Sequence, residues 1–137
     1  SGAIEHPTPP APKRILSEET SARMRGVMTK VVEEGTGKAA GIPGRLVAGK
    51  TGTAQKPTPE AGFRSGLYIG SFAGFAPADD PRIAVIVVID EPRNGHYGAV
   101  VAAPAFRAIC ERALMYLRVP PSGAVSRINV AMAEAEG

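Results

Sequence analysis

Residues 45–55 read RLVAGKTGTAQ, and the element that they form decides how the rest of the chain can be arranged. The apolar and β-branched residues of this stretch predict a strand. Its interior glycines, Gly49 and Gly52, indicate that another group approaches the main chain closely. We therefore expect a sheet that includes this strand and has something packed or bound against its backbone.

Two further strands are predicted downstream. Residues 67–75 alternate large and small side chains, and residues 83–89 form a continuous β-branched run. Such a run is typical of a strand buried on both faces. The short turn APADDP at residues 76–81 joins the two as an antiparallel hairpin. Residues 56–66, which include Pro57 and Pro59, predict a loop.

Helical patterns flank the strands on both sides. Ser17 is suited to cap a helix that ends at Gly35, and its apolar stripe should face the core: Met24, Val27, Met28 and Val31. Pro104 fits the first turn of a second helix, which Pro120 and Pro121 stop. The stripe of this helix consists of Phe106, Ile109, Cys110, Ala113, Leu114 and Leu117. The order helix, three strands, helix predicts an α+β fold with an antiparallel sheet flanked by helices.

Length and composition limit the possible functions. The 137 residues are 44% hydrophobic and 21% charged, the size and balance of one domain. Cys110 is the only cysteine and there are two histidines, so we expect no disulfide, no metal site and no cofactor. We divide the chain into a Pro-rich lead-in or tag remnant (1–14), the domain (15–121) and a small-residue tail (122–137).

The charge pattern favours an anionic ligand. The net charge is +3, and basic residues between Gly35 and Phe75 outnumber the single acid, Glu60: they are Lys38, Arg45, Lys50, Lys56 and Arg64. Nucleic acid is not expected, because only 5% of residues are aromatic and tryptophan is absent. No apolar run is long enough to cross a bilayer, so no membrane segment is expected in this chain.

Residues 44–51 match the phosphate-binding pattern G-x-x-x-x-G-K-[ST]. Such a loop must follow a strand and begin a helix, whose N–H groups then face the phosphates. Here a helix precedes the pattern, while Gly52, Pro57 and Pro59 follow it. This context argues against a nucleotide site, which we keep only as an alternative.

Lys50, Thr51, Gly52 and Thr53 match the K-T-G pattern of penicillin-recognising serine enzymes. A cation favours a deprotonated nucleophile and attracts a substrate carboxylate, and hydroxyls hydrogen-bond that carboxylate. A glycine lets a peptide lie flat along the edge of the strand.

The surrounding sequence resembles the class B penicillin-binding proteins. The resemblance runs in order through residues 32–40, 48–55, 68–77, 81–90 and 97–106, and covers about residues 15–121. The forms GTAQK and PRNGHYG look most like the septal, division-specific members. The resemblance implies the C-terminal part of a transpeptidase fold related to the β-lactamases.

The resemblance also implies a serine-type D,D-transpeptidase that cross-links peptidoglycan stem peptides ending in D-Ala-D-Ala and that β-lactams acylate. Lys50 and Thr53 would be catalytic, the latter through an oxyanion-binding N–H; Thr51, Gly52 and Thr53 would bind substrate. The loop 56–66 would border the cleft, with Tyr97 at its rim. The implied parent protein works at the periplasmic face of the bacterial inner membrane, with divisome proteins as partners.

One departure from the family pattern stands out. No serine has a lysine three residues later or an asparagine two residues later, so S-x-x-K and S-x-N are both missing. We therefore expect this chain to be inactive alone, and the strand at residues 83–89 to be an edge that pairs with another copy. The alternative is a non-enzymatic module that binds a carboxylate-bearing peptide or a protein partner along the Lys50 strand.

Overall fold

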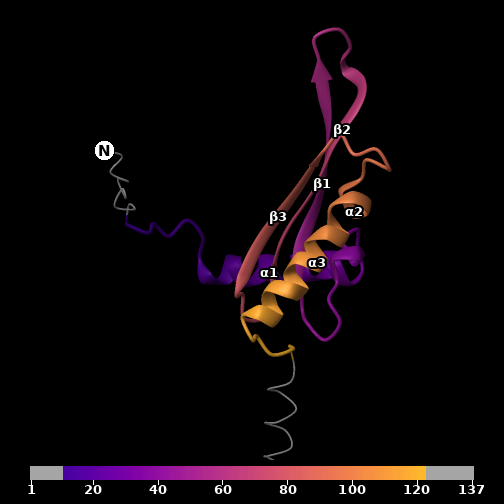
Figure 1. The fold of residues 1–137 in the computed structure, drawn as a ribbon. Helices are drawn as coiled ribbons and strands as arrows, with labels where there is room; N and C mark the ends of the chain where they lie inside the picture. The colour runs from indigo at the N-terminus through magenta and orange to yellow at the C-terminus, as the bar shows by residue number, and fades with distance from the viewer. Residues whose placement is uncertain (1–10, 123–137) are drawn as a thin grey trace, which may run out of the picture.

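The structure, a computed structural model, describes residues 11–122 (Figure 1). The elements are α1 (Glu18–Glu33), the 3-10 helix η1 (Lys38–Ala40), β1 (Ala48–Thr58), β2 (Gly62–Ala76), β3 (Ile83–Asp90), α2 (Gly98–Val101) and α3 (Ala103–Tyr116). The three strands form one antiparallel sheet in the order β1-β2-β3. The predicted α+β architecture is confirmed. The predicted lead-in up to residue 10 and the tail from residue 123 lie outside the described residues.

The core lies between the sheet and α3, which runs along one face of it (Figure 1). Phe72 in the middle of β2 is fully buried, and its ring lies 4.7 Å from that of Phe106 on α3. Gly74, two residues further on, leaves space for this contact, because a Cβ there would lie 3.0 Å from the Phe106 ring. Cys110 and Leu114 complete the buried stripe of α3, as the helical spacing predicts.

β3 does not have two buried faces. Val87 is buried against the core, but Ile86 is 69% exposed and Val88 is 55% exposed. Successive side chains of a strand point to opposite faces, and here α3 covers only one of them. The prediction of a strand buried on both faces is therefore wrong for the described residues.

The apolar stripe of α1 is also less buried than predicted. Met24 is 47% exposed and Val27 is 58% exposed, while Val32 near the C-terminal end of the helix is buried. This end packs towards η1 and β1, whereas the described residues leave about half of the Met24 and Val27 side chains exposed. The predicted N-cap is confirmed, since Ser17 Oγ accepts a hydrogen bond of 3.1 Å from Thr20 N–H.

The predicted loop at residues 56–66 is a hairpin that extends beyond the rest of the sheet (Figure 1). β1 continues to Thr58 and β2 begins at Gly62. The register shifts between Lys56 and Thr58, so Pro57 has no ladder partner. A bulge tolerates a residue that cannot donate a backbone hydrogen bond, which is why Pro57 does not end this strand; β1 ends one residue before Pro59.

Candidate substrate-binding strand

β1 displays the predicted site residues on its two faces. Thr51 and Thr53 share a face with their cross-strand neighbours Phe72 and Gly70, and Lys50 and Gly52 lie on the opposite face. Within the described residues β1 pairs only with β2, so its other edge has no strand partner. An extended peptide can be recognised by addition to such an edge.

Lys50 is exposed and keeps its charge available. Its Nζ donates to the carbonyl oxygen of Thr51 at 2.8 Å and to Thr51 Oγ1 at 3.3 Å. No carboxylate in residues 11–122 lies within ion-pair distance of this ammonium group. The site therefore presents a cation that an anionic ligand can meet.

The Thr51 hydroxyl has a partner that sequence reasoning missed. Thr36, in the connection between α1 and η1, places its Oγ1 3.1 Å from Thr51 Oγ1. The preceding Gly35 and following Gly37 fit closely against the end of α1, where a Cβ would lie within 3.1 Å of the Val31 carbonyl oxygen. The glycines on either side of Thr36 thus allow close packing against α1, and this packing places the Thr36 hydroxyl beside Thr51.

The Thr53 hydroxyl accepts a hydrogen bond from the start of α2. The backbone N–H of Gly98, the first residue of α2, donates to Thr53 Oγ1 at 3.2 Å. Because Thr53 Oγ1 accepts this bond, its own proton remains available for another acceptor. Neither α2 nor this contact was predicted, since a helix of four residues is too short to show a helical period.

Gly98 and Gly70 allow α2 to lie directly on the sheet, because a Cβ on Gly70 in β2 would lie 2.5 Å from Val101 Cγ2. A Cβ on Gly98 would lie 2.1 Å from the carbonyl oxygen of Ser71 and 2.4 Å from that of Gly52. A Cβ on Gly52 would lie 2.5 Å from Ser71 Oγ. Gly52 is therefore already constrained by its neighbour in β2, in addition to the role that the resemblance implies for it.

Aromatic rings line the same face beyond Thr53. The ring of His96 stacks on Tyr68 at 4.3 Å and lies 4.2 Å from Tyr97. Gln55 Nε2 donates to the Tyr68 hydroxyl at 3.2 Å, which ties this stack to β1. An open cavity of about 430 Å³ adjoins it and is lined by residues that include Tyr68, Glu91, Arg93 and His96. Tyr97 was predicted to lie at a rim; Tyr68 and His96 were not singled out.

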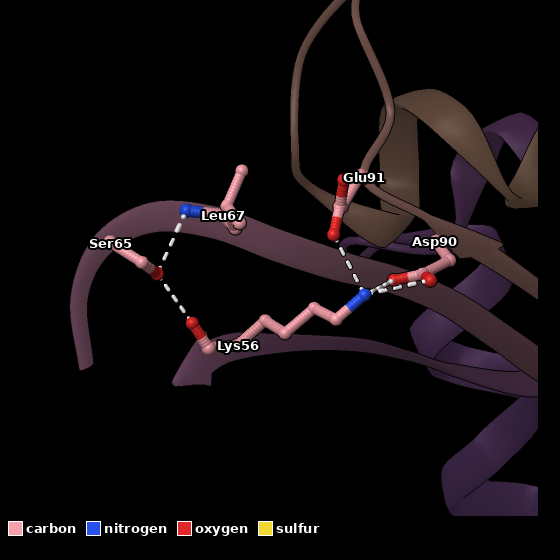
Figure 2. A network of polar contacts seen from close by, with 5 residues as sticks. All are labelled: Lys56, Ser65, Leu67, Asp90 and Glu91. Carbon is pink, nitrogen blue, oxygen red and sulfur yellow. Dashed lines mark hydrogen bonds and ion pairs between the residues drawn. The ribbon is translucent and has the colours of Figure 1, made fainter. Parts of the chain in front are cut away.

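Lys56 joins the far ends of β1 and β3 across β2 (Figure 2). Its Nζ lies 3.0 and 2.9 Å from the two carboxylate oxygens of Asp90 and 2.7 Å from Glu91 Oε1. The hydrogen bonds that Lys56 Nζ donates to Glu91 and then to Asp90 raise the pKa of its ammonium group. Ser65 Oγ donates to the Lys56 carbonyl oxygen and accepts from Leu67 N–H, which fixes the strand beside this cluster.

The phosphate-binding loop, kept as an alternative from the sequence, finds no support in the structure. Residues 44–51 continue into β1, and no helix begins at Lys50, so the arrangement needed for a phosphate-binding loop is not formed. Among residues 11–122, no three His, Cys, Asp or Glu side chains come together as a metal site. Cys110 is buried as predicted, and burial raises the pKa of its thiol to about 11.

Known proteins resemble this chain in both sequence and structure. The profile of the family described as "Penicillin binding protein transpeptidase domain" matches residues 3–111. The chain is 43% identical over 119 residues to stage V sporulation protein D of Bacillus subtilis, covering 86% of this chain and 18% of that protein. It is 41% identical over 119 residues to the probable peptidoglycan D,D-transpeptidase PenA of Neisseria flavescens, covering 85% and 30%.

A solved structure shares the fold of this chain as well as its sequence. The transpeptidase domain of penicillin-binding protein 3 from Burkholderia pseudomallei superimposes with a TM-score of 0.73 at 41% identity, covering 84% of this chain and 35% of that chain. This chain therefore spans less than a third of each of the two curated relatives and about a third of that domain. None of the helices in the described part is both long and apolar enough to cross a membrane. The profile match, the relatives and the common fold agree: the chain belongs to the penicillin-binding protein transpeptidase family.

Proposed function

We propose that this chain is part of a peptidoglycan D,D-transpeptidase and supplies the strand that binds the terminal carboxylate of a stem peptide or a β-lactam. The observation that carries the proposal is the arrangement of β1. Hydroxyls of Thr51 and Thr53 lie on one face of a strand whose other edge has no partner among residues 11–122. Lys50, which directly precedes Thr51, makes no ion pair with any carboxylate in that part of the chain. This combination suits a peptide that ends in a carboxylate.

In the proposed reaction, a serine outside this chain attacks the carbonyl carbon of the penultimate D-Ala. The serine oxygen forms an ester to that carbon, the peptide bond breaks, and the terminal D-Ala leaves with the proton. An amine from a neighbouring stem peptide then attacks the ester, forms a new amide and returns the proton to the serine. Lys50 would favour the deprotonated nucleophile, and Thr53 N–H would donate to the oxyanion.

The finer assignment rests on the resemblance. The forms GTAQK and PRNGHYG support a septal role, with divisome proteins as partners and a site at the periplasmic face of the inner membrane. In the sheet that residues 11–122 form, β3 is an edge strand, which supports pairing with a second copy of this chain. The missing S-x-x-K and S-x-N motifs support the proposal that the chain alone is inactive.

A chimeric domain tests the proposed function. This chain would replace the matching third of the Burkholderia pseudomallei transpeptidase domain, and labelling by a fluorescent penicillin would be measured. We expect labelling of the chimera and none of the chain by itself. A chimera that folds, shown by circular dichroism and a cooperative melt, yet is not labelled would contradict the proposal. Labelling of the chain alone would contradict its predicted inactivity.

A further inference from the structure

The segment 91–97 passes from one face of the sheet to the other. It starts after Asp90, which lies on the face of β3 that exposes Ile86 and Val88. It ends at Gly98, whose N–H reaches Thr53 on the opposite face. Its first residue is held by Lys56 and its sixth, His96, by the ring of Tyr68. The segment is therefore fixed near both ends, by an ion pair and by a stack.

We propose that Lys56 is a positioning residue that anchors segment 91–97 and thereby sets the Gly98 N–H on Thr53 Oγ1. The inference deepens the proposed function and rests on it, because it gives Thr53 the task of donating to a carboxylate. Lys56 itself does not touch the substrate. It acts through the six residues 92–97, which connect its partner Glu91 to α2.

Asp90 and Glu91 are held together by the ammonium group of Lys56. Asp90 and Glu91 are adjacent, and Lys56 Nζ lies within 3.0 Å of an oxygen of each. Without the ammonium group the two carboxylates would face each other with like charge, which favours their separation. Glu91 also adopts φ 49°, a left-handed conformation that a residue with a Cβ keeps only when its neighbours hold it. Its N–H donates to the Tyr68 carbonyl oxygen at 3.0 Å, and its side chain depends on Lys56.

The consequence for Thr53 concerns the direction of its hydroxyl. While Gly98 N–H donates to Oγ1, the hydroxyl proton must point elsewhere, and Thr53 is exposed to ligand. When the segment is released, Gly98 N–H loses this acceptor and the hydroxyl rotates freely. Preorganising a donor in this way reduces the ordering that binding requires.

Hydrogen exchange tests the proposal on the isolated chain. The exchange rate of the Gly98 amide would be measured by NMR in the wild type, Lys56→Met, Lys56→Arg and Lys38→Met. We expect Lys56→Met to accelerate Gly98 about tenfold while the core amide of Phe72 is unchanged. Lys56→Arg restores the cation and should remain near the wild-type rate. Lys38 is exposed and makes no ion pair among the described residues, so Lys38→Met should change neither amide.

Several outcomes would overturn the proposal. Unchanged Gly98 exchange in Lys56→Met would do so, as would an arginine variant that behaves like the methionine variant. If Lys56→Met does not fold, wild-type exchange in 1 M sodium chloride decides, because salt screens exposed ion pairs: selective acceleration of Gly98 supports the proposal and its absence contradicts it. None of these readouts needs a substrate. A chimera that is not acylated would therefore contradict the proposed function without contradicting the proposed role of Lys56.

Discussion

Cys110 shows what burial does to a single residue. Its side chain is fully buried on α3, and loss of water around the thiolate raises the pKa of the thiol from its ordinary value of 9.0 to about 11. At pH 8 this leaves about 100-fold less thiolate than in the unfolded chain. We therefore expect iodoacetamide to alkylate the folded chain at least about 100-fold more slowly than the urea-unfolded chain.

The raised pKa of Cys110 determines how the stability of the folded chain changes with pH. The unfolded chain loses the thiol proton near pH 9 and the folded chain only near 11, so the stabilisation is complete below pH 9 and disappears as the pH rises to about 11. The free energy of unfolding in urea should fall over this range, with a smaller fall in Cys110→Ala. Equal slopes in the two proteins, or fast alkylation of the folded chain, would show that Cys110 is not buried as described.

Gly98 is a residue whose missing side chain matters. An alanine there would bring its Cβ within 2.4 Å of two main-chain carbonyl oxygens, those of Ser71 and Gly52, and neither can rotate away. We expect Gly98→Ala to lower the free energy of unfolding by about 1–3 kcal/mol. Gly26→Ala is the matched control, because nothing lies within 4 Å of its Cβ and an alanine inside α1 should stabilise by about 0.5–1 kcal/mol. A neutral Gly98→Ala would mean that α2 does not rest on the sheet.

At the level of elements, local chemistry was enough to predict three strands and two helices in the right order. Ser17 caps α1 and Pro104 lies in the first turn of α3, both as predicted, because caps depend on neighbouring residues alone. β3 shows the limit: a β-branched run favours a strand, but the number of buried faces depends on what packs against it. The hairpin at residues 58–62 was missed because a shift in register absorbs Pro57.

The candidate site likewise has a part that could be predicted from the sequence and a part that could not. Lys50, Thr51, Gly52 and Thr53 are adjacent in sequence, so their pattern could be recognised before any fold was known. Their partners Thr36 and Gly98 come from elements 15 and 45 residues away, and only the folded chain brings them to β1. Lys56 is 34 and 35 residues away from Asp90 and Glu91, and charge composition alone could not pair them.

At the level of the whole molecule, β3 is an edge of the sheet that residues 11–122 form, and its outer face is apolar. We expect the chain to self-associate through it, detectable by sedimentation velocity at high protein concentration. A double variant, Ile86→Lys with Val88→Lys, should weaken association more than tenfold, because charge on an edge strand opposes pairing. Met115 on α3 is similarly exposed, so Met115→Lys serves as the control. A wild-type chain that stays monomeric throughout would rule out the pairing.

The central claim is that Thr51 and Thr53 bind a carboxylate, and acylation of the chimeric domain tests it most directly. The rate would be compared between a penicillin and its methyl ester, in the parent chimera and in the variant with Thr51→Val and Thr53→Val. Hydrogen bonds to a charged group are worth roughly 1.5–3 kcal/mol, so the variant should acylate with the free acid about 10- to 100-fold more slowly. With the ester, it should match the parent within about threefold, since the charge is gone. An equal loss for acid and ester would contradict the claim, because the threonines would then serve the fold or the chemistry and not the carboxylate.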